Sequence, residues 1–270
     1  MSVPDFQRAI LTHGGAGSDP KDSDGPKSAA IRGMDLMVDG GTALTAVVDA
    51  VKYLEDDPRF NAGSGSKLRI DGRTMQLDAS CMTSNNEFGA VACVENIKNP
   101  IDLAHGVLRH SPHILLVGDG ARIFAREHHI PVADLNGSAP IETSETSCDT
   151  VGAVAFDGTS FAAALSSGGL EKSALGRVGD VPLPGCGLFC GSSGAVACTG
   201  DGEFIALKLL AKTVYTWLEN SMSPDEAAHK AIHLFDPRVD IGLIILTRNG
   251  FASNARNGMP WSHMTENKHQ

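Results

Sequence analysis

A threonine at position 150 stands where an acidic, loop-like segment meets a predicted core strand. The segment ends at Asp149, and no Lys or Arg occurs between Arg126 and Lys172. Residues 151–156, VGAVAF, have the apolar pattern of a buried strand. A threonine hydroxyl is a poor nucleophile unless a base lies beside it, and no histidine is placed by sequence to serve Thr150.

Cleavage of the chain before Thr150 would supply that base. An α-amine with a pKa of about 8 is roughly a quarter neutral at about pH 7.5, whereas a lysine amine with a pKa of about 10.4 is about 0.1% neutral. We therefore interpret the acidic segment as an autoproteolytic linker that is cut between Asp149 and Thr150, although its spacing also fits an ordinary loop. One domain, residues 1–270, would then consist of an α chain, residues 1–149, and a β chain, residues 150–270.

Glycine-rich segments with polar side chains follow several predicted strands, where backbone N–H groups can be presented to a substrate. They are FNAGSGS (60–66), LSSGGLEK (165–172), GRVGDVPLPGCG (176–187) and ACTGDGE (197–203). Each one alone fits a tight turn. Together, and with Arg177 and Asp180 three residues apart in the third, they favour a binding site.

Other familiar chemistries are not supported by the sequence. It has no GxSxG nucleophile elbow, phosphate-binding loop, HExxH motif or complete dinucleotide fingerprint. The 10 histidines are scattered without metal-ligand spacing, and the 6 cysteines form no CxxC pair. We interpret the cysteines as mostly buried thiols.

The elements that position these residues follow from hydrophobic periodicity and from capping and turn signals. Expected helices cover 24–39, 43–57, 100–110, 118–127, 202–220 and 224–235, with caps at Thr42, Asp201 and Ser223. Expected strands include 8–13, 89–97, 194–199 and 239–247, with hairpins at 66–82 around Asp71-Gly72 and at 150–167 around Asp157-Gly158. Strand hairpins and helices are grouped rather than strictly alternating, which predicts an α+β fold with antiparallel sheets.

Composition limits the function classes. The chain has 270 residues, 42% of them hydrophobic, and 22 Lys+Arg against 32 Asp+Glu give a net charge of −10. Without a basic stripe, nucleic acid is not an expected partner. No targeting signal and no apolar run of membrane-spanning length occurs, so we expect no membrane partner and a cytoplasmic protein.

The chain resembles plant-type L-asparaginases and isoaspartyl peptidases, which are N-terminal nucleophile hydrolases. The motifs that carry the resemblance run in order over nearly the whole chain: LTHGGAG, LEDDPRFNAGSGS, LDASCM, GAVACVENIKNPIDLA, SPHILLVGDGARIFA, DTVGAVAFDG, SSGGLEKSALGRVGD and CTGDGE. The resemblance implies a four-layer αββα sandwich of two antiparallel sheets flanked by helices. It also implies self-cleavage and a homodimer of processed αβ protomers.

Residue roles follow from the resemblance position by position. Thr150 matches the nucleophile, and Ser167 stands where a second hydroxyl, usually threonine, orients it. Thr199 and Gly200 match the oxyanion hole, whose donors contribute about 3 to 4 kcal/mol each in comparable sites. Asn61 matches a side chain that assists there.

Substrate and ion binding are implied in the same way. Arg177 matches the guanidinium that binds the substrate α-carboxylate, and Asp180 with the Gly202 backbone matches the clamp on its α-ammonium. No cofactor is expected for the chemistry. A structural sodium ion is implied on main-chain oxygens of Leu54, Glu55, Asp57, Phe60, Ala62 and Ser64.

The resemblance favours hydrolysis of the β-amide of asparagine and of β-aspartyl dipeptides, but other functions stay open. The linker is shorter than usual for the family, and Asp149 before the threonine is more typical of glycosylasparaginases and of taspase. Action on sugar-linked asparagine and a taspase-like endopeptidase are therefore alternatives, as is an inactive uncleaved scaffold. Asp180 in place of the glutamine of taspase favours substrates with a free α-amine.

Overall fold

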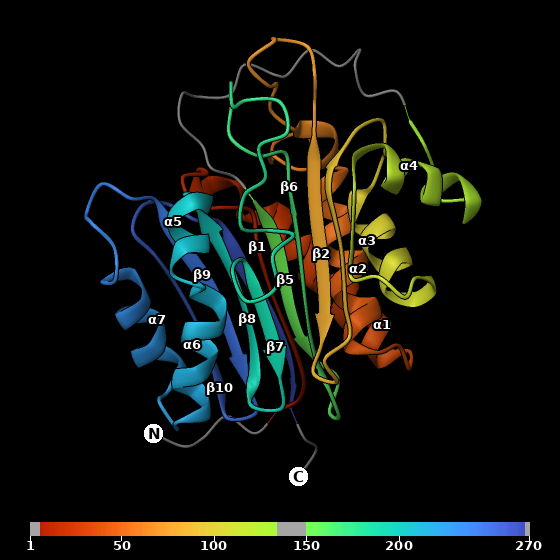
Figure 1. Ribbon diagram of the computed structural model, residues 1–270. Coiled ribbons are helices and arrows are strands. Elements are labelled where there is room, and N and C mark those ends of the chain that lie inside the picture. Colours follow the sequence, from red (N-terminus) through yellow and green to blue (C-terminus); the bar gives the residue numbers. More distant parts are fainter. Residues whose placement is uncertain (1–5, 134–149, 268–270) are drawn as a thin grey trace.

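Two β-sheets face each other in the computed structural model, which describes residues 6–133 and 150–267 (Figure 1). The 7-stranded sheet has the order β11-β1-β5-β6-β2-β3-β4, and the 4-stranded sheet the order β10-β9-β8-β7. The larger sheet consists of β1 (Phe6–His13), β2 (Leu77–Thr83), β3 (Phe88–Val94), β4 (Leu115–Val117), β5 (Val151–Phe156), β6 (Phe161–Ser167) and β11 (Trp261–Asn267). The smaller sheet consists of β7 (Leu188–Gly191), β8 (Gly194–Gly200), β9 (Ile241–Thr247) and β10 (Gly250–Ala255).

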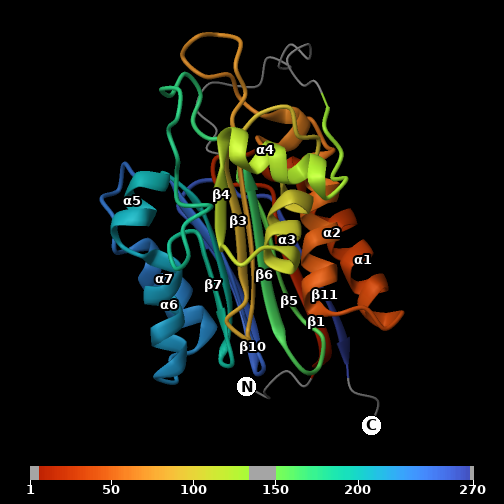
Figure 2. The ribbon, with the colours of Figure 1, turned by 45° about the vertical axis from the view of Figure 1, so that its right-hand side comes forward.

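Helices flank the two sheets. In Figure 1, α1 to α3 lie beside the larger sheet and α6 and α7 beside the smaller one, while Figure 2 shows α4 near β3 and β4. The helices are η1 (Pro20–Ser23), α1 (Asp24–Val38), α2 (Ala43–Glu55), η2 (Gly63–Gly65), α3 (Pro100–His110), α4 (Gly118–Glu127), α5 (Gly202–Leu207), α6 (Leu210–Glu219) and α7 (Pro224–Ile232). None of the helices in the described part of the chain is long and apolar enough to cross a membrane.

Strand periodicity determines which side chains reach the space between the sheets. Along β6, Ala164 belongs to the apolar cluster shared with α1 to α3, and Leu165 to the cluster between the two sheets. Because successive side chains of a strand point to opposite faces, Ser166 is on the helix-covered face and Ser167 on the face toward the smaller sheet. A third cluster, which includes Val214, joins the smaller sheet to α6 and α7.

Most of the predicted elements are confirmed. The β5–β6 hairpin pairs Phe156 with Phe161, as its turn sequence predicts. Thr42 caps α2 by accepting a hydrogen bond from the Thr45 N–H, and Ser223 forms a capping box with Glu226 at α7.

Three structural predictions need correction. The larger sheet is not wholly antiparallel, because the crossover helix α3 between β3 and β4 makes that pair parallel. Residues 66–76 form no strand of a hairpin: Arg69 N–H donates to Thr74 O, and β2 starts at Leu77. The helix predicted over 202–220 is divided at Leu209, whose φ is 45°.

Some strands were not predicted at all, namely β7, β10 and β11. β11 pairs along β1, from Phe6 opposite Asn267 to His13 opposite Trp261. This pairing joins the two ends of the sequence and has no local signal.

Candidate active site

Hairpin register brings Thr150 and Ser167 together. Val151 lies opposite Ser166, so the residue before β5 lies opposite the last residue of β6. The Thr150 Oγ1 donates to the Ser167 Oγ at 3.1 Å, and the Ser167 Oγ also accepts from the Gly169 N–H at 3.0 Å. Both hydroxyl residues are buried, with exposed fractions of 5% and 6%. The hydroxyl of Thr150 is therefore oriented by Ser167, which is itself fixed by the following turn.

Asn61 binds that turn from a separate loop. Its Nδ2 donates to the Gly169 O at 2.7 Å, and its main-chain O accepts from the Gly168 N–H at 2.8 Å. Its Oδ1 accepts from the Lys67 N–H at 2.9 Å. A Cβ on Gly168 would lie 2.3 Å from the Asn61 Oδ1, so only glycine fits there.

Thr199 and Gly200 reach the same place from the smaller sheet, at the end of β8. Thr199 is fully buried, and its Oγ1 accepts from the Ala16 N–H at 3.1 Å. Gly200 lines the pocket beside Thr150. Its φ is 131°, and a Cβ on it would lie 2.2 Å from the Asp240 O, so glycine is required for both reasons.

The guanidinium of Arg177 already has a carboxylate partner. Its Nε and Nη2 donate to the two carboxylate oxygens of Glu203, at 2.8 and 2.7 Å. Gly179 and Gly202 leave room for it, since a Cβ on them would lie 2.9 Å from Nη1 and 3.0 Å from Nη2. The pair thus uses the side edge of the guanidinium and leaves its Nη1–Nη2 edge for another ligand.

Asp180 is a buried carboxylate beside this guanidinium. Burial raises the pKa of Asp180 to about 7, and the nearby Arg177 charge opposes that rise. Its Oδ2 is buried and accepts no hydrogen bond from the described residues. A Cβ on Gly202 would lie 2.7 Å from the Asp180 Oδ1, so glycine is needed next to it. A buried acceptor atom without a donor is suited to an added cationic N–H group.

Two residues near the pocket were not predicted, Glu203 and Asp78. Asp78 is 1% exposed and lies opposite Ser167 in the β2–β6 pairing. It accepts from the Cys93 N–H at 2.9 Å, and burial raises its pKa to about 6. A charged residue inside the otherwise buried strand LDASCMT was a signal that could have identified it.

One narrow pocket joins these groups. Its lining residues are Asn61, Asp78, Thr150, Ser167, Gly169, Leu170, Arg177, Gly179, Asp180, Val181 and Gly200. Two predicted site residues are next to lining residues: Thr199 precedes Gly200, and Gly202 lies against the Asp180 side chain. Asp149 lies outside the described residues. Five free cysteines are described, of which only Cys93 is partly exposed.

In the loop expected to hold a cation, carbonyl oxygens pack closely against two glycines. The Glu55 O accepts from the Ser64 Oγ at 2.9 Å, and a Cβ on Gly63 would lie 2.5 Å from that oxygen. A Cβ on Gly65 would lie 2.1 Å from the Phe60 O. Carbonyl oxygens are ligands that suit an alkali cation, and the glycines let them approach closely. The residues thus fit the expected sodium ion, and the site stays a prediction.

Comparison with known proteins gives one consistent family. The family model described as Asparaginase matches residues 6–139 and 135–270. An isoaspartyl peptidase/L-asparaginase of Xenopus laevis is 36% identical over 287 residues, covering 96% of this chain and 93% of the relative. A plant-type L-asparaginase of Pyrococcus furiosus is 37% identical over 300 residues, covering 96% of each. An isoaspartyl peptidase/L-asparaginase of Danio rerio is 37% identical over 268 residues, covering 89% of this chain and 86% of the relative.

Proposed function

Because the chain belongs to the asparaginase family, we propose that it hydrolyses the side-chain amide of L-asparagine and the β-aspartyl bond of isoaspartyl dipeptides. One observation carries the proposal. An oriented threonine hydroxyl and an Arg–Asp pair line the same pocket. A small substrate with a charged amino-acid head can thus be bound at one end and attacked at the other.

Self-cleavage between Asp149 and Thr150 is the first step of the proposed mechanism. It produces the α chain, 1–149, and the β chain, 150–270, whose first residue is Thr150. The freed α-amine takes the hydroxyl proton, so that the Thr150 Oγ1 can attack the substrate carbonyl. The hydrogen bond to Ser167 supports this role because it holds the hydroxyl in one direction.

Charge then develops on the attacked carbonyl oxygen. The Thr199 hydroxyl and the Gly200 N–H are the proposed oxyanion donors, with Asn61 assisting. The C–N bond breaks, the proton held by the amine goes to the leaving nitrogen, and an aspartyl ester of Thr150 forms. Water hydrolyses the ester, releases aspartate and returns the proton to Thr150. Ammonia leaves from asparagine, and an amino acid leaves from an isoaspartyl dipeptide.

Substrate recognition is proposed at the charged end of the pocket. The free Nη1–Nη2 edge of Arg177 would bind the α-carboxylate in a fork. The Asp180 Oδ2 and the Gly202 backbone would bind the α-ammonium. The buried, unbonded Oδ2 supports this assignment, since a cationic donor would satisfy it.

The finer fold and assembly assignments belong to the same proposal. The three apolar clusters, between helices and sheet, between sheets, and between sheet and helices, support an αββα sandwich of the N-terminal nucleophile hydrolase type. We also propose a homodimer of processed protomers and a structural sodium ion in the 54–64 loop. The ion would fix the loop that carries Asn61, and no step of the chemistry depends on it.

A substrate panel on the processed protein tests the function. Asparagine, a β-aspartyl dipeptide, sugar-linked asparagine and a peptide with an internal aspartate are compared by kcat/KM. We expect hydrolysis of the first two and none of the last, because an internal aspartate lacks the α-ammonium and α-carboxylate. Preference for sugar-linked asparagine would indicate a glycosylasparaginase, and efficient cutting at internal aspartate a taspase-like endopeptidase.

A further inference from the structure

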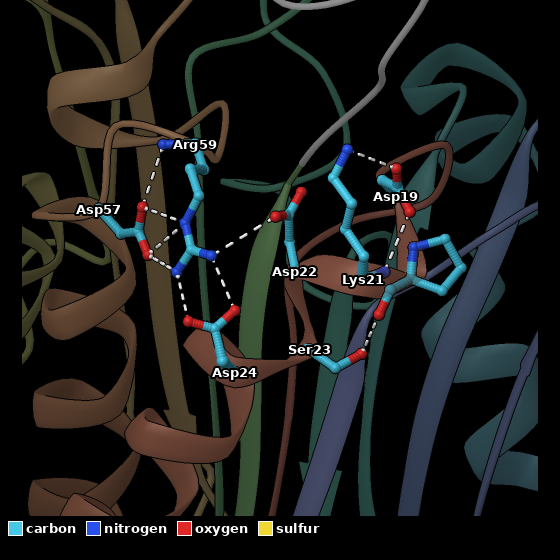
Figure 3. Close-up of polar contacts among 8 residues, drawn as sticks. Asp19, Lys21, Asp22, Ser23, Asp24, Asp57 and Arg59 are labelled. Carbon is cyan, nitrogen blue, oxygen red and sulfur yellow. Dashed lines mark hydrogen bonds and ion pairs between the residues drawn. The ribbon is translucent and has the colours of Figure 1, made fainter.

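Arg59 is surrounded by three carboxylates, and we call Arg59, Asp22, Asp24 and Asp57 the Arg59 clamp (Figure 3). Its Nη1 and Nη2 donate to the two oxygens of Asp24 at 2.7 and 3.1 Å. Its Nε and Nη2 donate to Asp57 at 3.0 and 2.6 Å, and its Nη1 reaches Asp22 at 3.4 Å. Hydrogen bonds to these carboxylates raise the pKa of Arg59, so its charge is permanent.

The clamp joins two separate parts of the chain. Asp57 and Arg59 belong to the loop after α2, whereas Asp22 lies in η1 and Asp24 is the first residue of α1. A bidentate Arg–carboxylate pair fixes both distance and orientation, which a single contact does not. The clamp therefore holds the outer side of the loop against the start of α1.

Phe60, the next residue, anchors the inner side of the same loop. It is 1% exposed, and its ring fills the space over Gly14 and Gly25, where a Cβ would lie 2.4 and 2.6 Å from it. Arg59 and Phe60 thus restrict the backbone conformation of the loop directly before Asn61. Asn61 in turn makes three hydrogen bonds, two with the turn at 168–169 and one from the Lys67 N–H.

We propose that Arg59 is a positioning residue for Asn61 and, through Gly169, for the Ser167 hydroxyl that orients Thr150. The proposal rests on the proposed function of this pocket. Single exposed ion pairs contribute little, about 0 to 1 kcal/mol, but here one guanidinium contacts three carboxylates at once and offsets part of their mutual repulsion. Without it, Asp22, Asp24 and Asp57 repel one another and push the loop away from α1. The displacement reaches Asn61 two residues later.

The test compares Arg59→Ala and Arg59→Lys with Arg238→Ala as a matched control. Arg238 also pairs with the aspartate two residues before it, Asp236, but it is highly exposed and belongs to no clamp. For Arg59→Ala we expect kcat on asparagine to fall about three- to tenfold while KM changes less than about twofold. Arg59→Lys keeps the charge without the fork and should lie between Arg59→Ala and the unmodified protein. Arg238→Ala should equal the unmodified protein.

A second measurement does not depend on catalysis. Hydrogen exchange followed by mass spectrometry reports the Lys67 and Gly168 amides, which donate to Asn61. In Arg59→Ala these amides should exchange about tenfold faster or more, with peptides of β8 and β9 unchanged. If Arg59→Ala folds poorly, Asp24→Asn removes one carboxylate of the bidentate contact and should show a smaller change in the same amides.

The outcomes separate the two proposals. An inactive unmodified protein overturns the proposed function, while faster exchange in Arg59→Ala still supports the positioning role. The positioning role is overturned if the Lys67 and Gly168 amides exchange at the unmodified rate in both Arg59→Ala and Asp24→Asn. It is also overturned if Arg59→Ala changes KM alone.

Discussion

The two ends of the pocket hold their polar groups in opposite ways. At the nucleophile end, the side chains of Thr150, Ser167 and Asn61 are neutral and joined to one another or to backbone by hydrogen bonds. At the charged end, burial raises the pKa of Asp78 to about 6 and of Asp180 to about 7, and the Asp180 Oδ2 has no donor among the described residues. The hydrogen bonds of the first end are formed without a ligand, whereas the second end has an acceptor that a ligand would satisfy.

This difference indicates how the site divides its work. Hydrogen bonds that are already formed need no reorganisation when a substrate arrives, which suits the groups that we propose carry out the chemistry. A buried carboxylate oxygen without a donor lowers stability, and a cationic ligand that donates to it recovers that loss. Substitutions at the nucleophile end should therefore change kcat, and substitutions at the charged end mainly KM.

The largest expected effect is at Thr150. Thr150→Ala removes the hydroxyl needed for both self-cleavage and attack, so the chain should remain whole and asparagine hydrolysis should fall roughly a thousandfold or more. Intact mass spectrometry of aged protein and steady-state assays check both effects. Thr159→Ala, in the exposed turn of the same hairpin, is the control. Full activity of an unmodified protein that is still one chain would contradict the self-cleavage mechanism.

Ser167 tests whether hydroxyl orientation matters at the same end. Ser167→Ala leaves the Thr150 hydroxyl without its acceptor, and kcat should fall about ten- to a hundredfold at nearly constant KM. Ser167→Thr should keep most of the activity. Ser166→Ala, on the opposite face of β6, should change kcat less than about twofold. If Ser167→Ala and Ser166→Ala change kcat equally, Ser167 has only the structural role of a residue before a turn.

Asp180 tests the charged end through pH. Its folded pKa of about 7 exceeds the ordinary value of 3.8, so between those values the folded chain keeps a proton that the unfolded chain has lost. Its stability contribution therefore becomes unfavourable as pH rises from about 4 to 7. Asp180→Asn should raise the free energy of unfolding at about pH 8 by about 1 to 3 kcal/mol, as measured by urea titration.

The same variant should lose substrate recognition. The carboxylate that would bind the α-ammonium is absent, so kcat/KM for asparagine should fall about ten- to a hundredfold, mostly through KM. In the unmodified protein, kcat/KM should rise with pH through about 7 as Asp180 ionises. A variant that binds asparagine normally would remove Asp180 from the substrate site.

The smallest expected effect is at Glu203. Its pair with Arg177 is half-exposed on the Glu203 side, with side-chain exposed fractions of 14% for Arg177 and 54% for Glu203. Glu203→Gln should loosen the guanidinium and raise KM about two- to fivefold, with less effect at high salt. Lys212→Ala, which disrupts a surface pair with Glu219, is the control. A lower KM in Glu203→Gln would show instead that Glu203 competes with the substrate carboxylate.

Local sequence was enough for the elements whose signals lie within a few residues. The Asp157-Gly158 turn determines the register of β5 and β6, and this register alone brings Thr150 opposite Ser167. Capping residues likewise define the starts of α2 and α7. The failures at residues 66–76 and at Leu209 have tertiary causes. The Ile70 N–H donates to the Ser173 O, about a hundred positions away, and the first amides of α6 donate to the carbonyls of residues 185–186.

The sequence by itself therefore determined the β5–β6 hairpin whose ends pair Thr150 with Ser167, the glycine-rich segments and most helices, because turn chemistry and side-chain periodicity act over short distances. Only the tertiary structure decided which other residues lie around Thr150 and Ser167 in the pocket. Gly200 arrives from the other sheet, Asn61 from the loop after α2, and Glu203 from α5 onto Arg177. These contacts join residues that are 26 or more positions apart, as Arg177 and Glu203 are. Sheet packing, strand order and buried charge set such contacts, and no short stretch of sequence contains them.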